Sequence, residues 1–173
     1  VNKKKRWITN SYSRGRVHLL RYYHDSIITS SETLLKDNPQ LTCRIKGLEK
    51  GSPARIILDK NLKTPVNSKI VKDANSYKTI ILFNKMNRRK IKILKDQKVN
   101  LFKIPLDNEN NLDLVKSLKK IKEFGYSRVL LESGVKLIEN FLKNDLIDEF
   151  KLFATKKNLK SNGMKSFKNN LLK

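Results

Sequence analysis

Short apolar runs alternate with helix-like segments along this chain, most regularly from residue 54 onward, and this alternation restricts the fold more than any other feature. Strand-type runs are expected at residues 26–29, 54–59, 79–83, 99–104, 127–133 and 148–155. Helices are expected at residues 11–23, 31–37, 87–97, 111–125 and 134–145, and a loop at residues 64–70. Such βα units build a predominantly parallel sheet with helices on both faces, so the sequence predicts an α/β fold.

The length and composition favour one folded domain over residues 1–173, with a basic and weakly patterned tail from about residue 156. No apolar run approaches the roughly 20 residues of a membrane span, and no secretory signal pattern is present. Cys43 is the only cysteine, and with only His18 and His24 as companions it does not predict a zinc site. These features favour a cytoplasmic setting and no metal.

The net charge of +23 has two explanations. It is typical of proteins that bind nucleic acid, an anionic surface or a phosphorylated small molecule. It also follows from a composition rich in Lys, Asn and Ile, which a genome biased toward adenine and thymine produces. The lysines are spread along the whole chain and do not gather on one helix with interleaved aromatic residues. Compositional drift is therefore favoured, and nucleic-acid binding ranks below it.

One junction between a strand and a helix is suited to anion binding. The apolar run that ends at Glu132 is followed at once by Ser133 and Gly134, which open a helix. The free N–H groups and positive dipole end of a helix favour phosphate there, and a glycine allows close approach. The alternative is a tight turn beside a solvated Glu132.

Other polar residues carry weaker signals. Asp59 ends a strand and is expected to cap the following turn. Arg21 and Arg44 have the chemistry to bind phosphate with two hydrogen bonds each, although a solvated surface charge is the alternative for both. His18 and His24 flank the first helix without a nucleophile nearby, so both are expected to be structural.

Five blocks of the sequence occur in the order found in one enzyme family. They are RWIT, VHLLR, SSETLLKDNPQLTCR, RIILDKNLKTP and VLLESGVKLIENFLKNDLIDE, and they span roughly residues 6–155. Together they resemble the reductase domain of bacterial riboflavin biosynthesis, in which W-I-T, D-V-H-x-L-R and R-T-P blocks follow one another with similar gaps. The shared order makes the resemblance more specific than any single block.

The resemblance implies a dihydrofolate-reductase-like fold and an NADPH-dependent activity. The enzyme would reduce 5-amino-6-(5-phosphoribosylamino)uracil by hydride transfer to the ribosyl C1′, which opens the sugar to a ribityl chain. A different pyrimidine reductase or a dihydrofolate-type reductase of the same fold stays open. The family also implies a homodimer and a deaminase domain in a longer parent chain. Its first and last strands are not found, so the chain is expected to be truncated at both ends.

Site residues follow from the resemblance by position. The cofactor-binding positions are Trp7, Thr33, Asp37, Gly134, Val135, Lys136, Leu137, Ile138, Glu139 and Asn140. The substrate-binding positions are Lys5, Arg21, Leu41, Arg44 and Glu132, where Lys5 replaces a serine of the family. No residue is assigned as catalytic, because the hydride comes from the cofactor and the proton donor is not identified.

The stretch TLLKDNPQLTCR, residues 33–44, gains a function from this assignment. Thr33 and Asp37 would face the cofactor, while Leu41 and Arg44 would face the substrate. Pro39 would fix the turn between them and so preserve their spacing.

Overall fold

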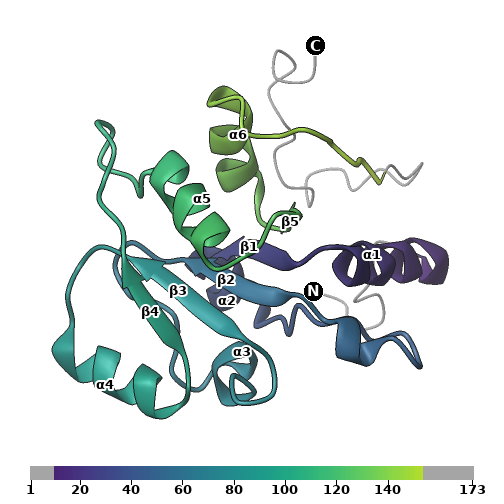
Figure 1. The fold of residues 1–173 in the computed structure, drawn as a ribbon, viewed down its shortest axis with the longest axis horizontal. Helices are drawn as coiled ribbons and strands as arrows, with labels where there is room; N and C mark the ends of the chain where they lie inside the picture. The colour runs from purple at the N-terminus through teal and green to yellow at the C-terminus, as the bar shows by residue number, and fades with distance from the viewer. Residues whose placement is uncertain (1–9, 154–173) are drawn as a thin grey trace, which may run out of the picture.

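The computed structural model describes residues 10–153 and shows one parallel sheet between two layers of helices (Figure 1). The strands are β1 (Ser26–Ser30), β2 (Ala54–Leu58), β3 (Thr79–Phe83), β4 (Asn100–Lys103) and β5 (Val129–Leu131). The helices are α1 (Ser11–Tyr23), α2 (Ser31–Asp37), α3 (Lys69–Lys72), α4 (Arg88–Asp96), α5 (Leu114–Glu123) and α6 (Val135–Lys143), with a short 3-10 turn, η1 (Glu49–Gly51). The strand order is β4-β3-β2-β1-β5, and all neighbours are parallel.

Alternate residues of the central strands form two separate cores. On one face, Ile27, Ile57 and Ile81 pack against buried side chains of α2, α3 and α4. On the other face, Ile28 and Ile56 pack against buried side chains of α5 and α6. Because β2 and β3 are covered on both sides, all of their residues are buried, which explains why they read as continuous apolar runs.

Helix starts follow capping chemistry that is visible in the sequence. Thr9, Asn10 and Ser11 are residue types that can begin α1, and the side chain of Asn10 accepts a hydrogen bond from the N–H of Ser13, which makes Asn10 the N-cap. Ser30, Asn87 and Asp113 cap α2, α4 and α5 in the same way. Two α-helices have no side-chain cap: the short α3, and α6, which begins after Gly134.

The structure corrects the prediction at several places. Residues 148–153 form no strand and pair with none of the five strands, and residues 154–155 lie outside the described range. The predicted loop at 64–70 runs into the short helix α3, and β5 is shorter than the expected 127–133. An apolar alternation forms a strand only where a neighbour completes its hydrogen bonds, and pairing is decided by the whole sheet.

The first helix is turned differently from the expected one. The spacing of apolar residues predicts that Val17 and Leu20 lie on the buried face of α1, but both are only half-buried, and Arg21 is its buried residue. The spacing of apolar residues does not predict this, because Arg21 is buried through polar partners and not through apolar contact. None of the helices between residues 10 and 153 has the length and apolarity that a bilayer crossing needs.

Candidate functional site

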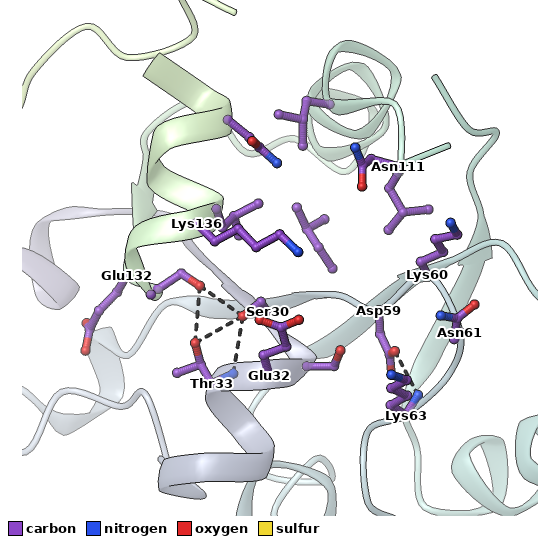
Figure 2. Close-up of a pocket in the computed structure, with 18 of the residues that line it drawn as sticks. Ser30, Glu32, Thr33, Asp59, Lys60, Asn61, Lys63, Asn111, Glu132 and Lys136 are labelled. Atoms are coloured by element: carbon purple, nitrogen blue, oxygen red, sulfur yellow. Dashed lines mark hydrogen bonds between the residues drawn. The ribbon is translucent and has the colours of Figure 1, made fainter. Parts of the chain in front are cut away.

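A cleft of about 860 Å³ lies at the carboxyl ends of the strands, where parallel α/β sheets bind their ligands (Figure 2). It is bordered by the start of α2, the loop after β2, the loop before α5, and the junction of β5 with α6. Its charged lining residues are the five lysines Lys36, Lys60, Lys63, Lys136 and Lys143 and the six acids Glu32, Asp37, Asp59, Asp107, Glu109 and Glu132. The chain's positive charge is therefore not concentrated in this cleft.

The amino end of α6 forms one wall of the cleft. Gly134 is its N-cap in an extended conformation, and no side chain caps the first turn. No hydrogen bond within residues 10–153 engages the N–H groups of Gly134, Val135 or Lys136. A Cβ at Gly134 would have no atom within 4 Å, so the space in front of the helix is open. These N–H groups and the helix dipole can hold a phosphate group.

Three hydroxyl groups connect this helix start to α2. The Ser133 Oγ lies 3.1 Å from the Ser30 Oγ and 3.2 Å from the Thr33 Oγ1. The Ser30 Oγ also caps α2 by accepting from the N–H of Thr33 at 3.2 Å. Figure 2 shows Ser30 and Thr33 of this cluster beside Glu32. The cluster therefore holds two helix starts in fixed positions around the same space.

Glu132, at the same junction, is held by a buried arginine. The Nε and Nη2 of Arg21 donate to the two carboxylate oxygens of Glu132 at 3.0 and 2.6 Å. The Nη1 of Arg21 donates to the carbonyl oxygen of Thr42 at 3.0 Å. Arg21 is 8% exposed and does not border the cleft, whereas Glu132 does. Arg21 thus orients Glu132 and leaves few of its own donors for a ligand.

Arg44 is two residues after Thr42, whose carbonyl oxygen accepts a hydrogen bond from Arg21. Its backbone N–H donates to the Nδ1 of His18 at 3.2 Å, and its guanidinium has no hydrogen-bond or ion-pair partner within residues 10–153. Partial burial and then the charge of Arg21 lower the pKa of Arg44, while Glu132 raises it. These effects place Arg44 within electrostatic range of the Arg21–Glu132 pair. Its free, exposed guanidinium is suited to an external anion.

The turn between α2 and Arg44 has an unusual backbone. Asn38 ends α2 in the left-handed region at φ 41°, and Leu41 adopts the same region at φ 58°. For a leucine this conformation costs on the order of 1 kcal/mol. Leu41 is 2% exposed, packs into the core and borders the cleft, so burial stabilises the strained turn. Asp37 and Pro39 border the cleft on the same side.

The second wall of the cleft contains residues that sequence reasoning did not assign to the site. Asp59 accepts hydrogen bonds from the N–H groups of Lys63 and Thr64 at 2.8 and 2.6 Å, which confirms its predicted role in capping the turn. Lys60 borders the cleft, and its ammonium donates to the carbonyl oxygen of Asn110. The only sequence signal for Lys60 is its place directly after a strand that ends at this edge.

The structure brings most of the assigned residues together. Those that border the cleft are Thr33, Asp37, Leu41, Glu132, Gly134, Lys136, Leu137 and Asn140. Those that do not are Arg21, Arg44, Val135, Ile138 and Glu139. Lys5 and Trp7 lie outside the described residues. Between residues 10 and 153, no group of three or more His, Cys, Asp or Glu side chains is placed to hold a metal ion.

Comparison with known proteins agrees with this geometry. The sequence pattern of the RibD C-terminal domain matches residues 1–158. The riboflavin biosynthesis protein RibD of Aquifex aeolicus is 32% identical over 152 residues, which are 88% of this chain and 40% of that protein. The 5-amino-6-(5-phosphoribosylamino)uracil reductase of Buchnera aphidicola from Acyrthosiphon pisum is 27% identical over 167 residues, which are 90% of this chain and 77% of that protein.

A solved structure of the Saccharomyces cerevisiae riboflavin biosynthesis reductase Rib7 has a TM-score of 0.66 and 26% identity, and the match covers 80% of this chain and 61% of that one. The chain belongs to the RibD C-terminal domain family, and it has the dihydrofolate-reductase-like fold of the riboflavin-biosynthesis reductases. It spans about 40% of the length of the RibD relatives that it matches.

Proposed function

We propose that this chain catalyses the NADPH-dependent reduction of 5-amino-6-(5-phosphoribosylamino)uracil to its ribitylamino product. The observation that carries the proposal is the junction of β5 with α6. Glu132, which borders the cleft and is held from behind by Arg21, is two residues from Gly134, which begins the uncapped helix α6. One short segment therefore places a substrate-side carboxylate and a cofactor-side phosphate site next to each other.

The residues present fit a nicotinamide cofactor. The free N–H groups at Gly134, Val135 and Lys136 would hold its pyrophosphate, and the space in front of them is open. The hydroxyl of Thr33 is fixed beside this helix start. Lys36 and Lys136 are two cations of the lining that would pair with the additional phosphate of NADPH. When bound, the reduced nicotinamide supplies a hydride to the ribosyl C1′.

The substrate would bind beside Glu132, whose carboxylate would accept hydrogen bonds from N–H groups of the aminopyrimidine. The guanidinium of Arg44, which is outside the cleft lining and has no partner within residues 10–153, would turn toward the cleft and bind the ribose 5-phosphate. Arg21 holds Glu132 from behind, and Leu41 contributes an apolar surface. The role of these residues is to align the two reactants and to exclude water, which requires no catalytic acid–base pair.

Oxidation of NADPH on addition of the phosphoribosylaminouracil, followed by the absorbance of the reduced cofactor, tests the activity. We expect consumption that requires the substrate. A Glu123→Gln variant on the exposed face of α5 should behave as the unmodified chain. Failure of a fully folded preparation to oxidise NADPH with this substrate, together with turnover of dihydrofolate or of another pyrimidine, would assign the alternative reductase of the same fold.

Substitution of Gly134 tests the phosphate site with little risk to folding. Aspartate is a preferred N-cap, Gly134 has φ −71°, and an added Cβ meets open space, so Gly134→Asp should leave α6 intact or more stable. The added carboxylate should reduce NADPH affinity at least tenfold through repulsion. Gly134→Asn is the matched neutral control and should bind NADPH more tightly than Gly134→Asp. Equal affinities for the two variants would contradict the proposed phosphate site.

The same family resemblance supports three wider proposals. We propose that the chain forms a homodimer, that a deaminase domain accompanies it in the parent chain, and that it works in the cytoplasm. The RibD relative of Aquifex aeolicus is more than twice as long as the matched region, which leaves room for a further domain in that protein. Light scattering of the purified chain would test the dimer, with a mass of about twice 20.2 kDa as the expected result.

A further inference from the structure

His18 contacts the segment that places Arg44. The Nδ1 of His18 lies 3.2 Å from the backbone N of Arg44 and 3.1 Å from the carbonyl oxygen of Thr42. Arg21, one turn further along α1, donates to the same carbonyl at 3.0 Å. Two residues on one face of α1 therefore hold the backbone of residues 42–44.

The other side of this segment is held as well. The N–H of Cys43 donates to the Oγ of Ser52 at 3.0 Å, and this hydroxyl lies 3.4 Å from the carbonyl oxygen of Cys43. Within residues 10–153, the N–H of Arg44 has no acceptor other than His18. Thr42 and Cys43 are buried, whereas Arg44 is exposed. His18 is thus the last anchor of the segment before the Arg44 side chain leaves it.

The two contacts of the His18 ring are not equivalent. One nitrogen cannot accept from the N–H of Arg44 and donate to the carbonyl of Thr42 at the same time. The carbonyl of Thr42 already has a donor in Arg21, whereas the N–H of Arg44 has no other acceptor. The arrangement that satisfies all of these groups is a neutral ring with an unprotonated Nδ1.

We propose that His18 is a positioning residue that fixes Arg44 for a sugar phosphate by accepting a hydrogen bond from the Arg44 backbone. This inference rests on the proposed function, because it specifies how Arg44, a proposed substrate-binding residue, is held in place. His18 does not border the cleft, so its effect is transmitted through the backbone of residues 42–44.

The surrounding charges favour the neutral ring. Arg21 faces His18 from α1, Arg44 from the segment itself, and Glu132 from the end of β5. Partial burial lowers the pKa of His18 most, and the charges of Arg21 and Arg44 lower it further, while the Thr42 carbonyl and Glu132 oppose them. His18 is therefore a neutral acceptor at neutral pH, and protonation would remove the acceptor.

Binding of ribose 5-phosphate and of NADPH, measured separately by calorimetry, tests the inference. We expect His18→Ala to weaken ribose 5-phosphate binding about three- to tenfold, as loss of one hydrogen bond implies, without changing NADPH affinity. His18→Asn, whose carbonyl oxygen can replace Nδ1 as acceptor, should retain most of the affinity. His24→Ala is the matched control, because within residues 10–153 the one hydrogen bond of its ring joins Nδ1 to the carbonyl oxygen of Leu20, at 2.6 Å, at the end of the same helix.

The pH dependence of ribose 5-phosphate affinity shows whether His18 acts as a hydrogen-bond acceptor or as a cation. Between about pH 8 and pH 5.5, the affinity of the unmodified chain for ribose 5-phosphate should fall relative to that of His18→Asn. The Asn variant corrects for ionisation of the phosphate itself, which occurs near pH 6. A relative rise in affinity would show that His18 acts as a cation, and it would overturn the inference.

Three further results would overturn it: full affinity in His18→Ala, equal weakening in His18→Asn and His18→Ala, or parallel loss of NADPH binding. Absence of ribose 5-phosphate binding by the unmodified chain would also do so. The proposed function can fail independently. If the expected pattern is seen but the phosphoribosylaminouracil is not reduced, His18 positions a sugar-phosphate site that serves a different reaction.

Discussion

Two buried arginines, Arg21 and Arg55, have different roles: Arg21 supports a residue of the candidate site, whereas Arg55 stabilises the fold away from it. Each forms an ion pair of 2.6 Å, Arg21 with Glu132 and Arg55 with Asp73. Arg55, on β2, is completely buried and also donates to Thr79 and to three backbone carbonyls. Arg21 retains 8% exposure, and its partner Glu132 borders the cleft.

The two arginines differ in where the groups that accept their hydrogen bonds lie. The carbonyl acceptors of Arg55 belong to the turn after α2, to α3 and to the segment between α3 and β3, so this arginine ties loops to the sheet. The partner carboxylate of Arg21 has 35% of its side chain exposed, so it remains available to a ligand. A third arginine, Arg128, forms an exposed pair with Asp25 at 3.6 Å. Three ion pairs of decreasing burial can therefore be compared within one protein.

Removal of Arg55 should have the largest effect on stability. We expect Arg55→Met to lower the free energy of unfolding by about 3–5 kcal/mol, because Asp73 loses its partner inside the fold. Urea denaturation would measure the loss. A second substitution at Asp73 should restore only part of it, since the carbonyl acceptors of Gln40, Ile70 and Tyr77 cannot be removed by mutation. An unchanged unfolding midpoint would show that Arg55 is not a structural anchor.

Removal of Arg21 should have a smaller effect on stability and a specific effect on binding. We expect Arg21→Met to cost about 1–3 kcal/mol of unfolding free energy, because Glu132 can turn toward water while the Thr42 carbonyl loses a donor. Ribose 5-phosphate and substrate affinity should fall more than NADPH affinity. A double-mutant cycle with Glu132→Gln measures the coupling of the pair, and zero coupling energy would contradict the orienting role given to Arg21.

The exposed pair should contribute least, and its contribution should depend on pH. Hydrogen bonds from the N–H groups of Arg128 and Ser127, at 2.8 and 3.1 Å, lower the pKa of the Asp25 carboxyl. A lowered folded-state pKa adds stability above the unfolded value of about 3.9 and loses it as the pH falls through the folded value. Urea unfolding of Asp25→Asn and the unmodified chain at several pH values should therefore show a difference that vanishes in acid. A difference in unfolding free energy that stays constant with pH would contradict a lowered pKa of Asp25 in the folded state.

NADPH binding tests the proposed cofactor end of the cleft at Asp37. Asp37 is exposed and borders the cleft at the end of α2. We expect Asp37→Ala to weaken NADPH binding a few-fold while leaving the unfolding free energy within about 0.5 kcal/mol, as for other surface substitutions. Fluorescence titration with NADPH would measure the effect. Unchanged affinity would remove Asp37 from the cofactor site.

Much of the fold could be predicted from local patterns. The buried strands β2 and β3 read as continuous apolar runs, and the caps Asn10, Ser30 and Asp113 are visible as residue types. The segment at residues 148–153 was predicted wrongly, because apolar alternation says nothing about a pairing partner. The burial of Arg21 was missed for a related reason, since polar partners and not periodicity account for it.

The order of the sequence blocks was enough to identify the family, the fold and the segment that begins α6, because capping and βα alternation act over a few residues and leave local signals. The tertiary structure decided the contacts between distant residues. Arg21 and Glu132 are 111 positions apart, and Thr33 and Ser133 are 100 positions apart. Parallel strands bring such residues to the same edge of the sheet, and their hydrogen bonds form only once that sheet exists. The start of α6 is therefore readable from the sequence, whereas the ion pair by which the buried Arg21 supports Glu132 is not.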